Sequence, residues 1–424
     1  MDKRYRLRIV DELLAGKLEA QGAVLIEGPK ACGKTTTAMQ IAKSILRMDN
    51  PEQMQQNLRM AQLNPSRLLA GNTPRLIDEW QLAPKLWDAI RYEIDNRGES
   101  GQFILTGSAV PPDTKEIFHS GTGRFARLLM RPMSLYESGE STGDVCLKTL
   151  FAGNVQLDGE SQLSIDDLAF LACRGGWPQA VGKSREASLS QAFDYVDGVI
   201  RSDINRADGI QKDTERVRKI LRSLARNQGG QVANAVIASD IALNGKPADG
   251  DTVKKYCDAL AMIFVTEDMS AWNPNLRSKA AIRTKDTRYF VDPSIAAASL
   301  GLGPEDLLND LNTFGFIFES LAIRDLRVYA QSLDGTVYHY RDNTGLECDA
   351  VIHRRNGSYG LIEIKLGGEK FVEEGALNLL RLKRKIDTTK MKEPAFLMVL
   401  TGTGQYPYKR EDGVLVIPIG CLKN

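Results

Sequence analysis

The stretch GPKACGKT, from Gly28 to Thr35, has two glycines separated by four residues and followed by a lysine and a threonine. The apolar run from Ala23 to Ile26 precedes it and suits a buried parallel strand. Four apolar residues follow at helical spacing: Ala38, Ile41, Ala42 and Ile45. A glycine turn between a strand and a helix aims backbone N–H groups at one point, which makes an anion site. The sequence therefore predicts an α/β domain with a phosphate-binding P-loop.

Nine residues of the loop are predicted to contact ATP: Gly28, Pro29, Lys30, Ala31, Cys32, Gly33, Lys34, Thr35 and Thr36. The two glycines permit the backbone angles that turn the amides inward. We expect Lys34 to reach the β- and γ-phosphates and the Thr35 hydroxyl to ligate Mg²⁺. A glycine turn with a solvated lysine is the alternative interpretation, and the flanking strand and helix favour the P-loop.

A second element, RLIDEW, supplies acidic residues at the end of a short apolar strand. Asp78 is expected to hold Mg²⁺ through water, and Glu79 to polarise the attacking water. Taken alone, an Asp-Glu pair after two aliphatic residues is an ordinary strand end. The next apolar strand, from Phe103 to Leu105, is followed by Ser108, which could sense the γ-phosphate. A turn or a helix cap is the alternative role for this serine.

Three arginines follow in the stretch GRFARLLMR, where they alternate with apolar residues in a strand-like pattern. They are Arg124, Arg127 and Arg131. One of them could contact the nucleotide of a neighbouring subunit in a homo-oligomer, and Arg124, nearest the glycine turn, is the candidate. A solvated edge strand explains the same pattern without any catalytic role.

The P-loop, LIDEWQ, ILTGSA and GRFARLLMRPMSLYE occur in this order, and together they resemble a large group of prokaryotic AAA-type ATPases similar to the archaeal ATPases. In that group a C-terminal domain of unknown function follows the ATPase domain. The resemblance covers nearly the whole chain and implies ATP binding with Mg²⁺. Because Glu79 stands at the catalytic position, it also implies that hydrolysis is retained.

The middle of the chain, from about residue 211 to 273, has the order helix, short helix, helix, strand, which is typical of a winged helix. Lys254 and Lys255 would lie on the exposed side of its third helix, the face that usually enters the DNA major groove. Contact with protein is the alternative, because Asp251 and Asp258 dilute the positive charge. Upstream, the GGWP element around Trp177 is interpreted as a packing turn.

The last region places acidic residues and a lysine on a predicted helix and two strands. Asp349 and Glu363 are a hairpin's length apart, so their carboxylates can meet across paired strands. Glu363 and Lys365 are two residues apart and share one face. With Glu319 on the preceding helix, this pattern resembles the PD-(D/E)XK nuclease-like fold. The resemblance implies that Asp349 and Glu363 bind Mg²⁺ and that Lys365 acts on the attacking water. A surface hairpin with an ordinary Glu–Lys pair is the alternative.

Composition limits the class of protein. The 424 residues carry a net charge of only +1, so nucleic-acid contact would need local basic patches. Six cysteines without CxxC pairs suit a reducing cytosol, and no apolar run reaches membrane-span length, so we expect a soluble cytoplasmic protein. The expected segments are 1–145 for the ATPase domain, 146–210 for a helical connector, 211–273 for the winged-helix-like module and 274–424 for the nuclease-like domain.

Two functions are consistent with these predictions. The first is a Mg²⁺-dependent ATPase coupled to a DNA-binding or nuclease-like C-terminal module. The second is a regulatory nucleotide switch whose C-terminal domain is a catalytically inactive scaffold for a protein partner. Glu79 favours hydrolysis, and the set formed by Asp349, Glu363 and Lys365 favours cleavage. A structural hub with little hydrolysis is a third, weaker interpretation.

Overall fold

The computed structural model describes residues 5–109, 118–242, 249–274 and 285–424. The chain divides into two compact units. The first unit comprises Met1–Pro132, Val199–Asp213 and Cys257–Val265, and the second comprises Met133–Gly198, Thr214–Tyr256 and Thr266–Asn424. None of the helices in the described residues combines the length and apolar character that crossing a membrane requires.

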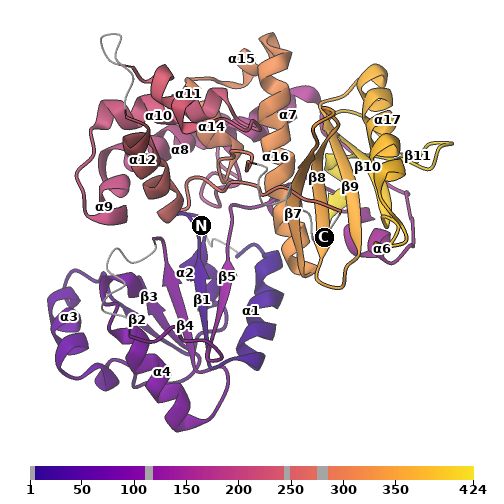
Figure 1. Cartoon of the computed structure of the whole chain (residues 1–424). Helices are drawn as coiled ribbons and strands as arrows, with labels where there is room; N and C mark the ends of the chain where they lie inside the picture. Colours follow the sequence, from indigo (N-terminus) through magenta and orange to yellow (C-terminus); the bar gives the residue numbers. More distant parts are fainter. Residues whose placement is uncertain (1–4, 110–117, 243–248, 275–284) are drawn as a thin grey trace. The chain divides into compact units, whose positions relative to one another are not determined.

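The first unit contains a five-stranded sheet in the order β2-β3-β4-β1-β5, in which every pair of neighbours is parallel (Figure 1). Its strands are β1 (Ala23–Glu27), β2 (Ser44–Arg47), β3 (Arg75–Asp78), β4 (Phe103–Gly107) and β5 (Phe125–Leu129). The helices are α1 (Ile9–Ala20), α2 (Lys34–Met39), α3 (Met54–Leu63), α4 (Leu86–Arg97) and α9 (Ile204–Asp208), with short turns η1 (Pro65–Arg67), η2 (Trp80–Leu82) and the π-helix η4 (Val199–Asp203). This topology places the P-loop, which follows β1, at the carboxyl edge of the sheet.

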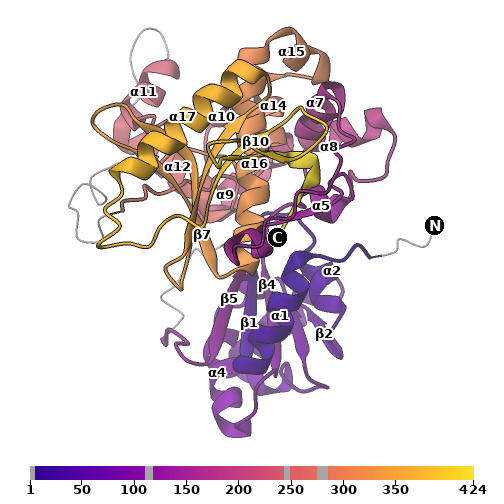
Figure 2. The same cartoon turned by 90° about the vertical axis from the view of Figure 1, so that its right-hand side faces the viewer.

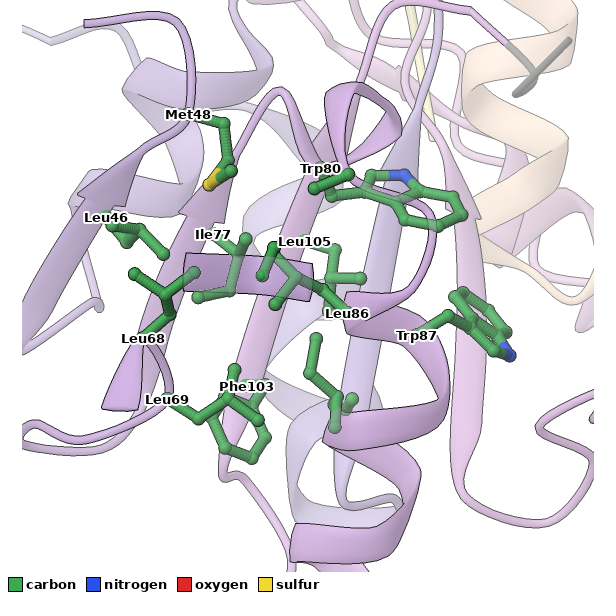
Figure 3. Packing of buried hydrophobic residues seen from close by; sticks show 14 of the residues in the cluster. Leu46, Met48, Leu68, Leu69, Ile77, Trp80, Leu86, Trp87, Phe103 and Leu105 are labelled. Carbon is green, nitrogen blue, oxygen red and sulfur yellow. The ribbon is translucent and has the colours of Figure 1, made fainter. Parts of the chain in front are cut away.

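Alternate residues of each strand pack on opposite faces of this sheet, which is why the central strands are continuously apolar. On one face, Val24 and Ile26 of β1 pack against Leu14 and Leu18 of α1, which lies over β1 in Figure 2. On the other face, Leu25 joins a core to which α3, α4 and η2 contribute. Figure 3 shows this second core, whose members include Ile77, Trp80, Leu86, Trp87, Phe103 and Leu105.

The helix after the P-loop is shorter than the apolar spacing predicted. It ends at Met39, and Ile45 lies in β2, paired in register with Leu76 of β3. Ile45 is β-branched and therefore suits a strand as well as a helical spacing. In β2 its side chain is exposed, while the side chain of Leu46 is buried. The predicted order of β1, the loop, the helix and the Asp-Glu strand is nevertheless present.

The second unit contains a six-stranded mixed sheet in the order β11-β12-β10-β9-β8-β7. Figure 1 shows the sheet between α16 and α17. Its strands are β7 (Gly335–Arg341), β8 (Glu347–Arg354), β9 (Tyr359–Lys365), β10 (Phe396–Thr401), β11 (Tyr408–Lys409) and β12 (Leu415–Pro418), and a separate pair joins β6 (Val145–Cys146) to β13 (Leu422–Lys423). The helices are α5 (Leu135–Ser138), α6 (Leu147–Phe151), α7 (Ile165–Arg174), α8 (Arg185–Gly198), α10 (Thr214–Arg226), α11 (Asn234–Asp240), α14 (Pro293–Leu300), α15 (Pro304–Asn309), α16 (Leu311–Ser332) and α17 (Glu369–Lys385), with the short turn η5 (Ile419–Cys421).

Two stretches of the chain each contain more than one element. The stretch TVYHYRDNTGLECDAVIHR forms β7 and β8, because Asp342 builds a turn between them by accepting hydrogen bonds from the amides of Thr344 and Leu346. The stretch LSQAFDYVDGVIRSDINRA contains the end of α8, then η4 and α9. Phe193 of α8 is exposed.

The predicted winged-helix region contains three helices in the expected order: α10, α11 and α12 (Gly250–Met262). After α12 the chain makes isolated antiparallel bridges, Thr266 with Phe290 and Met269 with Thr287. Lys254 and Lys255 are exposed. The winged helix itself remains a prediction, because these elements do not establish a DNA-binding face.

The GGWP element packs against a buried ionic network in the second unit. The amide of Gly176 donates to Asp292 Oδ2 at 2.9 Å, and Trp177 Nε1 donates to Ser294 Oγ at 2.9 Å. Arg324 Nη1 of α16 lies 3.1 Å from the same Asp292 oxygen, and both side chains are buried. The element therefore joins α7, α14 and α16.

Candidate functional site

The P-loop backbone has the shape that its glycines predict. Gly28 has φ +150°, and a Cβ there would lie 2.0 Å from the carbonyl oxygen of Met130. Gly33 has φ +104° and precedes the first residue of α2. A side chain at Gly28 would therefore collide with backbone, which explains why the loop needs glycine there.

Lys34 is buried beneath the loop, with its side chain folded back along it. Its Nζ donates to the carbonyl oxygens of Gly28 at 2.8 Å and Pro29 at 2.6 Å. Carbonyl oxygens are uncharged acceptors, whereas a phosphate makes a stronger, charge-assisted hydrogen bond with an ammonium. The loop therefore holds a positive charge against two of its own carbonyl oxygens, which a phosphate could replace.

Asp78, at the end of β3, accepts hydrogen bonds from two hydroxyl groups. Its Oδ1 accepts from Thr35 Oγ1 at 2.7 Å and from Thr106 Oγ1 at 2.5 Å. A hydroxyl and a carboxylate are hard oxygen ligands of the kind that Mg²⁺ prefers. The residues present at this point therefore fit the ion that P-loop ATPases use.

Glu79 has a left-handed backbone conformation, with φ 55° and ψ 44°. Non-glycine residues rarely adopt it, and such strained conformations cluster at active sites and ligand-binding sites. Its carboxylate accepts hydrogen bonds from Ser108 Oγ at 3.3 Å and from Gln81 Nε2. Ser108 was predicted as a site residue from the sequence, but Gln81 was not. No sequence pattern marks a functional residue in the short turn η2.

The predicted arginines are held by acidic partners inside the first unit. Arg124 Nε lies 2.8 Å from Asp95 of α4, and Arg127 Nη1 lies 2.6 Å from Glu27 at the end of β1. Both arginine side chains are largely exposed, so these pairs contribute little to stability. A role for Arg124 in a neighbouring subunit stays a prediction.

Two further residues, Arg8 and Asp203, support the loop and were not found from the sequence. Arg8, at the start of α1, donates to the carbonyl oxygens of Cys32 at 2.9 Å and Arg131 at 2.8 Å. Lys30 forms an ion pair with Asp203 of η4. Both partners lie far from the loop in sequence, so no local pattern could indicate these contacts.

The acidic residues of the second unit converge where β8 begins and β9 ends. Ala350 pairs with Ile362 in register, which brings Asp349 beside Glu363. Lys365 Nζ lies 2.8 Å from Glu363 and 3.4 Å from Asp349. The amide of Ile364 donates to Asp349 at 2.7 Å.

Glu319 of α16 and Asp349 line one small cavity of about 40 Å³ together with Tyr289, whose hydroxyl hydrogen-bonds Glu319. Burial, and then the charge of Asp349, raises the pKa of Glu319 to about 8. The same two causes raise the pKa of Glu363 to about 8. Burial lowers the pKa of Lys365, but the charges of Asp349 and Glu363 hold it above its usual value. The carboxyl groups of Glu319 and Glu363 therefore keep their protons at pH values where an exposed glutamate is already ionised.

The arrangement of this second cluster does not by itself show a metal centre. Within residues 5–109, 118–242, 249–274 and 285–424, no three His, Cys, Asp or Glu side chains are grouped so as to hold a metal ion. Lys365 lies between the two carboxylates where a cation would compensate them. Metal binding by Asp349 and Glu363 therefore stays a prediction.

Family models match three parts of the chain. The model described as an AAA domain matches residues 20–139, which include the P-loop, Asp78 and Glu79. The match supports a P-loop ATPase of the AAA type over residues 20–139. The models that match residues 165–306 and 314–422 are described only as domains of unknown function, DUF8612 and DUF4143. They do not identify a nuclease-like fold.

Several bacterial proteins are similar to this chain beyond the AAA domain. Uncharacterised proteins of Mycobacterium bovis and Mycobacterium tuberculosis are each 23% identical over 348 residues, which is 81% of this chain and 70% of theirs. An uncharacterised protein of Haemophilus influenzae is 24% identical over 246 residues, 57% of this chain and 55% of its own.

Two solved structures are distantly similar. A Walker-type ATPase of Pyrococcus abyssi has a TM-score of 0.41 and 13% identity, covering 70% of this chain and 99% of its own. A RuvB variant of Thermotoga maritima has a TM-score of 0.28 and 18% identity, covering 61% of this chain and 88% of its own.

Proposed function

We propose that the AAA domain binds and hydrolyses MgATP. The observation that carries the proposal is the convergence of Thr35 and Asp78, 2.7 Å apart, beside the buried Lys34. Lys34 would exchange its carbonyl partners for the β- and γ-phosphates, and Thr35 and Asp78 would hold Mg²⁺. The ion, when bound, would neutralise charge that develops on the phosphate oxygens.

Glu79 is the residue that would orient the attacking water. Ser108 and Gln81 hydrogen-bond its carboxylate, which limits its rotation. Both partners are uncharged hydrogen-bond donors, and they orient the carboxylate that would accept a proton from water. This combination favours a hydrolysing ATPase over a nucleotide-binding scaffold.

Steady-state ATP hydrolysis by the full chain tests this proposal. Wild-type protein should release phosphate only with Mg²⁺ present, and Lys34→Ala should abolish both nucleotide binding and release. Lys43→Ala, which removes an exposed lysine from the same domain, serves as the matched control and should behave as wild type. Equal hydrolysis by Lys34→Ala and Lys43→Ala would contradict the assignment of the loop.

The second unit suggests a second function, metal-dependent cleavage of a nucleic acid. The observation that favours it is that Asp349, Glu363 and Lys365 meet at the end of one hairpin. Asp349 and Glu363 would hold Mg²⁺, and the Lys365 ammonium would orient the attacking water. Contact of Lys254 and Lys255 with DNA belongs to the same proposal.

Degradation of single- and double-stranded DNA, with and without ATP, tests this second function. Cleavage should require Mg²⁺ or Mn²⁺ and should be lost in Lys365→Ala. Wild-type protein that neither binds these metals nor cleaves DNA or RNA would favour the other interpretation, in which the domain is an inactive scaffold for a protein partner.

A further inference from the structure

A second cavity of the same domain lies away from the acidic cluster, between α17 and the turn that joins β7 to β8. Its volume is about 350 Å³, which is large enough for a phosphate with its attached sugar. The turn contributes Thr344, Gly345 and Leu346, and the C-terminal half of α17 contributes Asn378, Arg381, Arg384 and Lys385. None of these seven residues is acidic.

Two of the three cations in this cavity are available to a ligand. Lys385 Nζ donates hydrogen bonds to Asp342 Oδ2 at 2.7 Å and to Thr344 Oγ1 at 2.9 Å. Arg381 and Arg384 are exposed, and within the described residues neither makes an ion pair or hydrogen bond. The cavity therefore has two guanidinium groups without a counter-charge.

The helix arranges these side chains along one flank. Leu379 and Leu382 pack into the core, which fixes the rotation of α17. Asn378 and Arg381 are three residues apart and face the turn together. Basic residues in a last helical turn also stabilise the helix dipole, but that effect requires neither a cavity nor Arg381, which precedes the last turn.

We propose that this cavity binds a phosphodiester of a nucleic acid strand, with Arg381 and Arg384 as the phosphate-binding residues. Arginine presents a planar fork of donors that matches two phosphate oxygens, and it is more weakly hydrated than lysine. Asn378 adds an uncharged amide, and Leu346 offers apolar contact to a sugar. The inference rests on the nucleic-acid function proposed for this domain.

The position of the cavity suits a strand better than a free phosphate. Leu346 precedes Asp349 by three residues along the start of β8, a distance of about 10 Å at strand spacing. Along the axis of a duplex, where each strand carries one phosphate per about 3.4 Å, that distance spans about three nucleotides. A nucleic acid held by the arginines could therefore place a further phosphodiester at the acidic cluster.

Fluorescence anisotropy of labelled DNA oligonucleotides, single-stranded and duplex, tests the inference on the full chain. EDTA excludes cleavage during the measurement. The double variant Arg381→Ala/Arg384→Ala should bind at least roughly tenfold more weakly, because each hydrogen bond to a charged group contributes substantially. The salt dependence of duplex binding should also fall by about 1.8 in log–log slope.

The matched control is Lys370→Ala/Lys383→Ala, which removes two cations of α17 that do not line the cavity. It should retain wild-type affinity within about twofold. Equal DNA affinity of the arginine variant and this control would overturn the inference. So would an arginine variant that loses only the binding of inorganic phosphate, since the cavity would then serve a free anion. Wild-type protein that binds DNA through these arginines without cleaving it would contradict the nuclease proposal alone.

Discussion

Glu79 has a backbone conformation that a glutamate rarely adopts, and this conformation sets the direction of its side chain. Its left-handed conformation directs the carboxylate toward Ser108 and Gln81, which lie just after β4 and in η2. Asp78, one residue earlier, keeps strand geometry and turns to Thr35 and Thr106. The unusual dihedral angles of Glu79 therefore point its carboxylate away from that of Asp78, so the two adjacent acids have different partners.

The hydrogen bond from Gln81 should matter for the reaction and little for binding. Gln81→Ala should lower kcat about tenfold with unchanged nucleotide affinity, because a hydrogen bond to a charged group contributes about 1.5 kcal/mol. Gln53→Ala, at an exposed glutamine of the same domain, is the control. Kinetics together with a nucleotide titration separate the two parameters, and an unchanged kcat would remove Gln81 from the mechanism.

Gly28 should be irreplaceable, whereas Gly16 should not. Gly28→Ala forces a Cβ into the Met130 carbonyl and should lower the thermal midpoint of the AAA domain and abolish nucleotide binding. Gly16 lies in α1, and a Cβ added there would have no neighbour within 4 Å, so Gly16→Ala should stabilise the helix by about 0.5–1 kcal/mol. Differential scanning calorimetry distinguishes the two, and a benign Gly28→Ala would contradict the loop geometry.

At the scale of elements, the strands of the AAA domain were predictable because β1, β3 and β4 are buried on both faces and read as apolar runs. The end of α2 was not, because Ile45 fits a helical spacing and a strand equally well. Contacts across the sequence, such as Arg8 with Cys32 or Arg324 with Asp292, leave no local pattern. The convergence of Asp349 and Glu363 was anticipated, since hairpin length and side-chain alternation constrain it.

The buried pairing of α14 with α16 should dominate the stability of the second unit. Arg324 lies 3.1 Å from Asp292 and 2.7 Å from Asp325, and all three side chains are buried. Arg324→Met leaves two buried carboxylates without their cation and should cost about 3–5 kcal/mol. The loss should shrink as the pH falls, because protonation removes the unpaired charge and an acid whose folded pKa is raised destabilises the fold at higher pH.

The control for this prediction is Arg341→Ala, which breaks a half-exposed pair with Glu347. It should change stability by less than about 1 kcal/mol. Urea denaturation at two pH values measures both variants. Similar urea midpoints for Arg324→Met and Arg341→Ala would show that the fold does not depend on pairing Arg324 with Asp292 and Asp325.

At the scale of the whole molecule, an AAA domain is joined in one chain to two regions whose families have no described function. Arg124 is the residue through which a neighbouring subunit would take part in hydrolysis. Breaking its exposed ion pair with Asp95 would cost little free energy. Nucleotide hydrolysis would then depend on a second copy of the chain. The acidic cluster and the arginine cavity would work within one chain.

Mixing two inactive variants tests whether Arg124 acts between subunits. Arg124→Ala and Lys34→Ala should each be inactive, and a mixture should regain part of the ATPase activity, because a shared interface can contain one intact Lys34 and one intact Arg124. Arg127→Ala is the control for a neighbouring arginine. A wild-type monomer in analytical ultracentrifugation that still hydrolyses ATP would rule out the intersubunit role.

The most direct test of the central claim, that this chain is an ATPase with Glu79 as its water-orienting residue, is hydrolysis by Glu79→Gln. The variant keeps the shape of the side chain but removes the charge that accepts a proton. It should bind MgATP with wild-type affinity, since Lys34, Thr35 and Asp78 are untouched, and single-turnover hydrolysis should fall by at least about a hundredfold. Hydrolysis at the wild-type rate with binding intact would contradict the claim.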